Sequence, residues 1–210
     1  MQLIGMLDSP YVRRVAVSLQ LLDLPFEHRA LSVFRTYPQF RDINPLVKAP
    51  TLVCDDGTTL IDSSLILDYA EHLNPTKSLL PSALGERQRA LRILGLALAA
   101  CEKSVQIIYE RELRPAETRH QPWLDRVSEQ LLAAYQALET ELLQAPLAVE
   151  QARIDQAGIT TAVAWYFTQA MVPDVVRGDD FPALQRFSQA AEALPAFCAA
   201  PHGLETYRAG

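Results

Sequence analysis

A proline-entered strand, a tight turn, a second strand and an acid–serine pair follow one another between Val47 and Ser63, and no other feature constrains the fold as strongly. Pro50 lacks a ladder donor, so it belongs at the first residue of a strand or at a bend, and an X-Pro bond is the only peptide bond that adopts cis at low cost. Asp62 and Ser63 stand where the next helix begins, and the free N–H groups and positive dipole end of a helix start attract an anion. Backbone polar groups, a carboxylate, a hydroxyl and a helix start suit the capture of a zwitterionic peptide. The sequence therefore predicts a peptide-binding site.

The first 77 residues alternate between strand and helix patterns. Apolar residues recur at helical spacing after Pro10, and they alternate with polar residues after the break at Asp23-Leu24-Pro25. The order of elements is βαβ followed by ββα, the order of a thioredoxin-like fold. The expected elements are strands at Gln2–Met6, Phe26–Leu31, Thr51–Cys54 and Thr59–Ile61, helices at Pro10–Leu22 and Ser63–Leu73, and a loop at Ser32–Asn44.

A linker follows, because the segment from Asn74 to Ser82 contains two prolines and small polar residues without an apolar period. Everything after it has a helical pattern. We therefore expect an α+β chain with a thioredoxin-like domain over residues 1–77, a linker over 78–85 and an all-helical bundle domain over 86–210. The helices are expected at Glu86–Arg114, Trp123–Leu143 and Ile159–Met171. The last of these is apolar nearly all round, which predicts a buried helix, and Asp155 is its expected N-cap.

Charge and composition exclude several classes of function. The net charge is −6 and no block of Lys and Arg exists, which argues against a nucleic-acid partner. The longest apolar run, Ile93 to Cys101, is about half the length that crosses a bilayer. Met1 leads directly into a strand without a basic region, so we expect no signal peptide and a cytoplasmic protein. The three cysteines and four histidines lack metal-ligand spacing, so no metal is expected.

The block described above resembles the glutathione-binding half of a glutathione S-transferase, over residues 44–52 and 60–69. The start of the chain, Leu7-Asp8-Ser9-Pro10-Tyr11-Val12-Arg13-Arg14, is similar to bacterial, theta-like or zeta-like members that use serine. Residues 180–184 and 197–201 match the closing segments of the family, so the resemblance covers nearly the whole chain. It implies a homodimeric enzyme that transfers glutathione to a small electrophile. Family members usually carry an acid three residues after the cap at Asp155, whereas this chain has Gly158.

The resemblance assigns catalysis to Ser9, whose hydroxyl would donate a hydrogen bond to the glutathione thiolate. Free cysteine titrates near 8.5, and lowering that pKa by two units takes about 2.7 kcal/mol. A hydrogen bond to a charged acceptor supplies roughly 1.5–3 kcal/mol and a helix N-terminus about 0.3–1 kcal/mol, so no dedicated base is needed. The alternative is that Ser9 only caps the helix that begins at Pro10.

The remaining glutathione contacts are assigned in the same way. Ala49, before a cis Pro50, would pair its backbone with the cysteinyl part of glutathione. Lys48 would reach the glycyl carboxylate, or would be an ordinary surface charge. Asp62 would meet the γ-glutamyl ammonium and Ser63 the γ-glutamyl carboxylate, although most members carry glutamate in place of Asp62. Without the resemblance, Asp62 and Ser63 would read as an ordinary helix cap.

The second substrate has no motif. Candidates for an apolar cleft between the domains are chosen by expected position, and packing explains each of them equally well; they are Leu7, Tyr11, Gln106, Tyr109 and Trp165. Two alternatives to a transferase stay open: a glutathione-dependent isomerase or dehalogenase, and a non-catalytic scaffold that binds a protein partner. The helix from Glu86 is apolar on a broad face, which favours a homodimer, with Leu91, Leu94 and the exposed part of the Ser63–Leu73 helix as the expected contacts.

Overall fold

The computed structural model describes residues 1–208 and divides the chain into two compact units. Unit 1 comprises Met1–Leu80 together with the chain from Ala193 onward, and unit 2 comprises Pro81–Glu192. The mixed sheet of unit 1 and the helices of unit 2 confirm the predicted fold class of a thioredoxin-like domain followed by an all-helical one. The division at Leu80 falls inside the expected linker. The last residues, which we expected in the helical domain, group with unit 1.

Unit 1 is built on a four-stranded sheet of order β2-β1-β3-β4. The strands are short: β1 (Gln2–Ile4), β2 (Glu27–Arg29), β3 (Thr51–Val53) and β4 (Thr59–Leu60). β1 pairs in parallel with β2, so that Leu3 lies opposite His28, and antiparallel with β3, so that Leu3 also lies opposite Leu52. A parallel pair needs a crossover, and helix α1 (Pro10–Leu21) supplies it.

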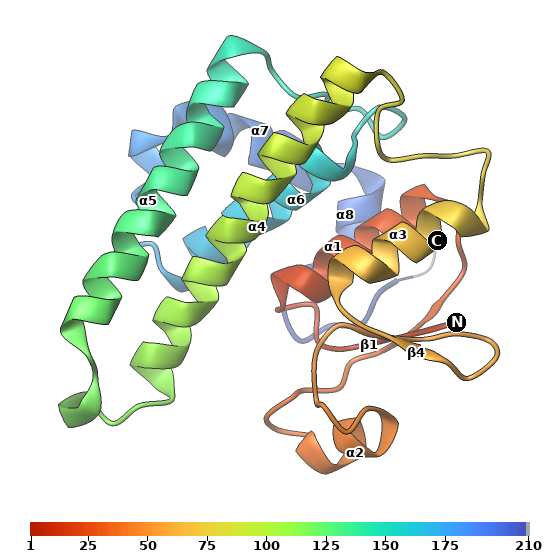
Figure 1. The fold of residues 1–210 in the computed structure, drawn as a ribbon, viewed down its shortest axis with the longest axis horizontal. Helices are drawn as coiled ribbons and strands as arrows, with labels where there is room; N and C mark the ends of the chain where they lie inside the picture. Colours follow the sequence, from red (N-terminus) through yellow and green to blue (C-terminus); the bar gives the residue numbers. More distant parts are fainter. Residues whose placement is uncertain (209–210) are drawn as a thin grey trace. The chain divides into compact units, whose positions relative to one another are not determined.

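Helices cover both faces of this sheet (Figure 1). α1 contacts α3 (Ser63–Leu73) and α8 (Pro195–Ala199), while α2 (Tyr37–Ile43) lies on the opposite face. The apolar core between α1, α3 and the sheet is completely buried; it includes Leu3, Ile4, Val12, Val15, Leu19, Leu52 and Ile66. The N-terminal ends of α1 and α3 are therefore supported by a buried apolar core.

The expected loop at Ser32–Asn44 is wrong over half its length, because α2 occupies Tyr37–Ile43. This helix has seven residues and buries only Phe40, so it shows no repeated apolar spacing. A single buried phenylalanine contributes roughly 1.5–3 kcal/mol, which is sufficient to fix a short helix on a sheet but leaves no periodic signal.

The linker residues are fixed to unit 1 by side-chain contacts. The backbone N–H of Leu79 donates to Glu71 Oε1 over 2.9 Å, and Asn74 Nδ2 donates to the carbonyl of Leu22 over 2.8 Å. Lys77 forms an ion pair with Asp23. These contacts explain why unit 1 extends to Leu80.

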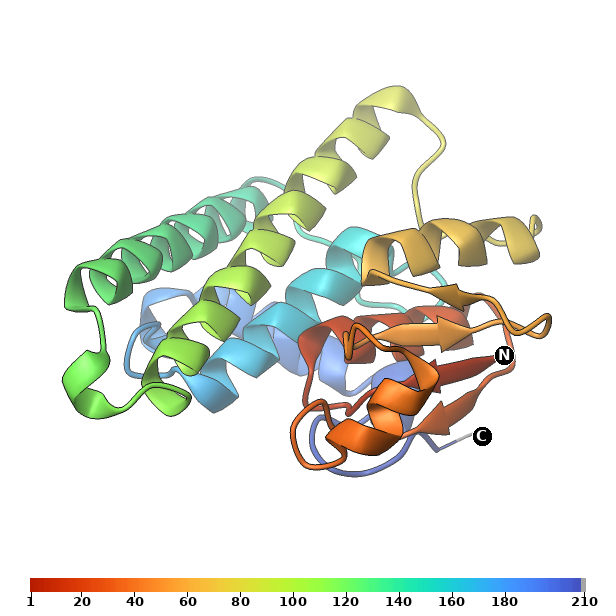
Figure 2. The ribbon, with the colours of Figure 1, turned by 60° about the horizontal axis from the view of Figure 1, so that its bottom comes forward.

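Unit 2 contains four long helices: α4 (Leu84–Glu112), α5 (Gln121–Gln144), α6 (Gln156–Met171) and α7 (Pro182–Glu192). Two short 3-10 helices, η1 (Ala116–Thr118) and η2 (Gly178–Asp180), lie in the connections. α4 packs against α5 and α6, and α7 packs against α5 and α6, so the four helices form a ring (Figure 2). Among residues 1–208 no helix combines the length and the apolar character that crossing a bilayer requires.

The predicted N-cap of α6 is confirmed, and its predicted burial is confirmed as far as Trp165, whereas Tyr166 and Met171 are exposed. The first ten residues of α6, residues 156–165, are all buried, and Asp155 accepts a hydrogen bond from the N–H of Gly158 over 2.9 Å. A Cβ at Gly158 would lie 2.9 Å from Cγ1 of Ile154 and 3.4 Å from Cζ of Phe187. A side chain at this position would require Ile154 to shift, so the close packing favours glycine.

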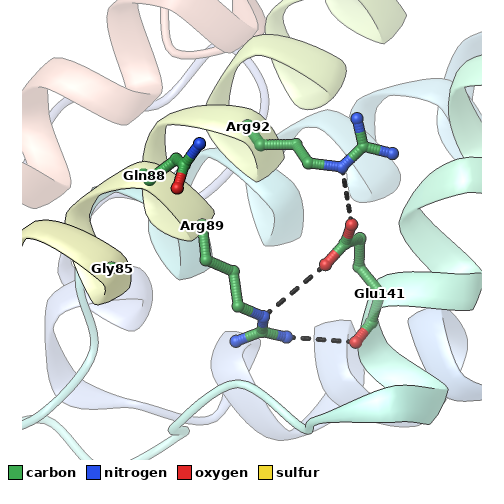
Figure 3. A pocket seen from close by; sticks show the side chains of 5 residues that line it. All are labelled: Gly85, Gln88, Arg89, Arg92 and Glu141. Carbon is green, nitrogen blue, oxygen red and sulfur yellow. Dashed lines mark hydrogen bonds and ion pairs between the residues drawn. The ribbon is translucent and has the colours of Figure 1, made fainter.

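A charged clamp joins α4 to the end of α5 (Figure 3). Arg92 Nε donates to Glu141 Oε1 over 2.7 Å, and Arg89 Nε lies 3.5 Å from Glu141 Oε2. Arg89 also donates to the carbonyls of Glu141 and Ala145 at the end of α5, and the Glu141 carbonyl accepts the N–H of Ala145 as well. With Gly85 and Gln88 these residues line an open hollow of about 380 Å³. Because Glu141 lies between the two guanidinium groups, it occupies the place that an anionic ligand would take.

Candidate functional site

Ser9 lies at the N-cap of α1, directly after the loop that leaves β1. Its Oγ accepts the N–H of Val12 at 3.5 Å, which is a long and weak cap contact. A hydroxyl carries one proton and two lone pairs, so the proton of Ser9 stays available for an anion while the oxygen caps the helix. The glycine at position 5 lets the end of β1 lie close to the first turn of α1. Its φ is +140°, and a Cβ there would lie 2.5 Å from Cγ2 of Val12.

The Ala49–Pro50 bond is cis, as expected, and Pro50 is buried immediately before β3. A Cβ at Gly5 would lie 3.2 Å from the Cβ of Ala49, so the cis-proline turn sits against the chain that leads to Ser9. Thr51 Oγ1 donates to the carbonyl of Lys48 over 2.7 Å and accepts from Asn44 Nδ2 over 2.8 Å. These bonds fix the backbone of the turn, and the Lys48 side chain is exposed.

Val47, two residues before Ala49, has a φ of +48°. A β-branched residue in the left-handed region is an outlier that costs of order 1–3 kcal/mol. The surrounding turn therefore holds this backbone in a conformation that valine alone disfavours.

Asp62 caps α3, and its exposed carboxylate shares one oxygen between two backbone groups. Oδ1 accepts the N–H of Ser64 over 2.8 Å and that of Leu65 over 3.4 Å, whereas neither bond uses Oδ2. The peptide bond before Asp62 is cis. Ser63, the first residue of α3, is buried. The cap thus leaves one carboxylate oxygen on the surface beside a helix start.

The residue that sequence reasoning missed at this site is Arg14. Its side chain is 1% exposed, and Nη1 donates to the hydroxyls of Ser63 and Ser64 over 3.1 and 3.2 Å. A guanidinium only donates, so both serine oxygens act as acceptors toward it and their protons point elsewhere. Arg14 therefore ties α1 to the start of α3 and brings a buried positive charge behind the helix terminus.

Asp8 is a second residue that the sequence did not single out. Burial raises the pKa of its carboxyl group, and the charges of His202 and Arg35 oppose that shift. His202 belongs to the chain after α8, so this C-terminal segment reaches the residue next to Ser9. No sequence spacing connects positions 8 and 202, and only the fold could reveal the pair.

The candidates for the second substrate divide by burial. Leu7 is fully buried, and Trp165 is buried in unit 2, where it packs edge-on against Tyr135 at 5.2 Å and near Phe181 at 5.8 Å between ring centroids. Tyr109 is 45% exposed on α4. Tyr11 and Gln106 are half-buried, and Gln106 Nε2 donates to Glu102 Oε1 over 2.9 Å. Core packing thus accounts for Leu7 and Trp165.

Among residues 1–208, no group of three or more His, Cys, Asp or Glu side chains gathers in a way that could hold a metal ion.

Comparison with known proteins identifies a matching family model and several similar proteins. Residues 3–78 match the family model described as the glutathione S-transferase N-terminal domain. An uncharacterized GST-like protein of Escherichia coli K12, YibF, is 27% identical over 82% of this chain and 85% of its own length. A glutathione S-transferase of Methylobacterium radiotolerans, solved with glutathione sulfonate, is 27% identical with a TM-score of 0.86, covering 95% of this chain and 93% of that one.

A glutathione transferase family member of Pseudomonas fluorescens Pf-5, solved with S-(propanoic acid)-glutathione, is 30% identical with a TM-score of 0.81. The match covers 97% of this chain and 98% of that one, so both units are included. Together with the cis-proline turn and the capped start of α3, these similarities show that the chain belongs to the glutathione S-transferase family.

Proposed function

We propose that this protein is a glutathione transferase that binds glutathione in unit 1 and uses Ser9 to stabilise its thiolate for attack on an electrophile. The observation that carries the proposal is the start of α3, where Asp62 presents a carboxylate oxygen and the buried Arg14 supports Ser63. The amino and carboxylate groups of a γ-glutamyl residue need one acceptor and one cluster of donors, and this helix start offers both.

The middle of the peptide would lie along the cis-proline turn. Ala49 would pair its backbone with the cysteinyl residue, as extended peptides pair with an exposed strand edge, and Lys48 would meet the glycyl carboxylate. Two of the similar proteins named above were solved with glutathione derivatives bound, which supports glutathione as the ligand. The electrophile would then meet the thiol near Ser9, with Tyr11, Gln106 and Tyr109 as the remaining candidates for its pocket.

Calorimetric titration with glutathione tests the binding half of the proposal. Asp62→Ala should weaken binding by roughly 2 kcal/mol, about 30-fold, because a charge-assisted contact is lost. Asp68→Ala is the matched control, since Asp68 is an exposed acid on the same helix but not at its start, and it should bind like the wild type. Equal affinity in both variants would remove Asp62 from the site.

Turnover tests the catalytic half. Ser9→Ala should keep glutathione affinity within a few fold and lower turnover roughly 10- to 1000-fold, because the hydroxyl acts on the thiolate rather than on ground-state binding. The thiolate absorbance of bound glutathione should titrate at higher pH in the variant. An unchanged titration would assign thiolate stabilisation to the backbone and helix dipole instead.

Two experiments separate the proposed transferase from the alternatives. An isomerase or dehalogenase would use the same Ser9, and a broad electrophile screen separates these reactions. A scaffold would keep the fold without glutathione binding, so a wild type that fails to bind glutathione would favour it.

We further propose a homodimer. On α3 the exposed apolar residues Leu65, Tyr69 and Leu73 follow one another at intervals of four and form a stripe, and on α4 Leu84 and Leu91 are exposed. An isologous two-fold contact would bury both surfaces. Light scattering should report about twice the chain mass of 23.4 kDa, and Leu65→Glu should shift the protein toward the monomer.

A further inference from the structure

The chain after α8 is held against unit 1 at several points. Arg13, a buried residue of α1, donates from Nε to the carbonyl of Ala200 over 2.7 Å. Further on, the N–H of Arg208 donates to the carbonyl of Ala199 over 2.8 Å. The ring of Tyr207 packs on Phe26, with 4.5 Å between the ring centroids. We call residues 200–208 the C-terminal strap. Figure 2 shows it returning to the sheet.

One histidine joins the strap to the sheet through both ring nitrogens. The backbone N–H of Tyr207 lies 2.9 Å from Nδ1 of His28, and Nε2 of His28 lies 2.7 Å from the carbonyl of Gly5. A backbone N–H only donates and a carbonyl only accepts. His28 must therefore carry its proton on Nε2 and keep a lone pair on Nδ1. Only the neutral ring satisfies both partners.

Protonation acts on the two contacts differently. A second proton on Nδ1 would point at the N–H of Tyr207 and replace an attraction by a repulsion between donors. The contact from Nε2 to Gly5 would persist. The loop from Gly5 to Ser9 therefore keeps its hydrogen bond to His28, while the strap loses its own.

We propose that His28 is a pH-operated latch that holds the end of the C-terminal strap, residues 203–208, closed on the edge strand β2 when neutral and releases it when protonated. The release exposes the ring of Phe26, on which Tyr207 packs, next to the edge strand β2. The proposal stands apart from glutathione binding, because none of its contacts involves Asp62, Ser63 or the cis-proline turn.

Burial is the main influence on the pKa of the His28 ring. Glu27 and Arg29 flank His28 on β2, and the strap carries Glu205, Arg208 and His202. Glu205 and Arg208 pair with each other, and Gln2 on β1 contacts both Glu27 and Arg29. Tyr207 titrates far above neutrality, since burial raises its pKa. Burial lowers the pKa of His28 below 6.5, against a smaller opposing effect of the Gly5 carbonyl.

His202 acts in the opposite sense at the near end of the strap. It lies close enough to Asp8 for their charges to interact. A protonated His202 would attract the Asp8 carboxylate, and Arg13 Nε donates to the carbonyl of Ala200 independently of His28. After the loss of the His28 anchor, residues 203–208 keep only the backbone bond from Arg208 to Ala199 and the ring contact of Tyr207 with Phe26. We expect these surface contacts to open with it on acidification, while residues 200–202 stay in place.

Backbone relaxation of the full-length, ¹⁵N-labelled protein tests the latch. Between pH 7.5 and pH 5 the order parameters of residues 204–208 should fall from about 0.85 to below about 0.6. Those of residues 200–202 should stay high. The midpoint should coincide with the titration of the His28 ring, read from its own carbon-bound protons, and should lie below pH 6.5.

Two substitutions separate charge from packing. His28→Gln offers a neutral amide with one acceptor and one donor group, and should keep the strap ordered at both pH values. His28→Lys carries a permanent charge and should free it at both. His72→Gln, on the exposed face of α3, is the matched control and should retain the wild-type transition. Order parameters that stay constant while His28 titrates in the wild type, or a wild-type transition in His28→Gln, would overturn the proposal.

Discussion

Replacing Arg14 by methionine tests whether the buried guanidinium supports anion binding at the start of α3. Methionine fills similar volume without charge, so the change removes the donor to Ser63 and Ser64 and little packing. Arg14 Nη1 lies 3.1 Å from Ser63 Oγ. A carboxylate accepting from that hydroxyl would lie about 2.8 Å further on, which places it at most about 6 Å from the guanidinium.

The magnitude follows from Coulomb's law. Two unit charges about 6 Å apart interact by about 2.8 kcal/mol at an effective dielectric constant of 20, which suits partly buried sites. The loss of Arg14 should therefore weaken glutathione binding by roughly 1.5–3 kcal/mol, or about 10- to 150-fold. Stability should also fall by roughly 1–3 kcal/mol, because two serine hydroxyls lose a donor. Arg14→Lys should restore part of the affinity, since it keeps the charge but not the forked geometry.

Arg13→Met is the matched control. Arg13 is the neighbouring residue on α1 and equally buried, but it donates to the carbonyl of Ala200 and lies over the ring of Phe197. It should lose stability and keep glutathione affinity within about threefold. Calorimetry and urea unfolding on both variants separate the two effects. Equal losses of affinity in Arg13→Met and Arg14→Met would show that general loosening of α1, and not the charge of Arg14, controls binding.

Substitutions at three further positions, one of them with a matched control, test local energetics, each by urea unfolding at pH 7 unless stated. Val47→Gly should raise the free energy of unfolding by about 1 kcal/mol, because glycine adopts a φ of +48° without strain; an unchanged or lower value would mean that Val47 is not strained. Gly158→Ala should cost roughly 1–3 kcal/mol through the clash with Ile154, whereas Gly95→Ala, with open space around the added Cβ, should stabilise α4 by about 0.5–1 kcal/mol; equal effects at both glycines would refute the clash. Burial raises the pKa of Asp155 in the folded protein, so the folded state holds its proton to higher pH than the unfolded state, and this carboxyl makes stability fall as the pH rises above about 3.8. Asp155→Asn keeps a cap residue and should remove that component from a stability profile between pH 3 and pH 7; a profile parallel to that of the wild type would contradict the assignment.

The sequence predicted the architecture because periodicity and punctuation agree along most of the chain. α3 was predicted at its observed bounds, Ser63–Leu73, since its cap and its apolar spacing coincide. The strands are each shorter than predicted: β2, for example, covers Glu27–Arg29 within the predicted Phe26–Leu31. Strand patterns extend beyond the residues that pair, because alternation continues into the flanking backbone.

The misses share a physical cause: they depend on contacts between residues far apart in the sequence. Arg13 and Arg14 are adjacent on an amphipathic helix, where charges ordinarily face water, yet both are buried because Ala200 and Ser63 offer acceptors. His28 lies on an edge strand and meets the strap 179 positions later. Periodicity indicates which face of an element is buried. It carries no information about which polar groups from distant parts of the chain lie against that face.

The arrangement of the two helix starts explains why a serine would suffice at the thiol. Ser9 caps α1 and Asp62 caps α3, so the thiolate and the γ-glutamyl carboxylate of bound glutathione would each face the positive end of a helix dipole. Because Arg14 also projects from α1 and reaches Ser63, the same helix would position both the thiol and the γ-glutamyl end of the peptide. A hydroxyl that donates to a thiolate already placed in such a field has to supply only about 2–3 kcal/mol, which lies within the range of one charge-assisted hydrogen bond. The proposed chemistry therefore needs no dedicated base at Ser9, and it depends on how precisely α1 holds the hydroxyl.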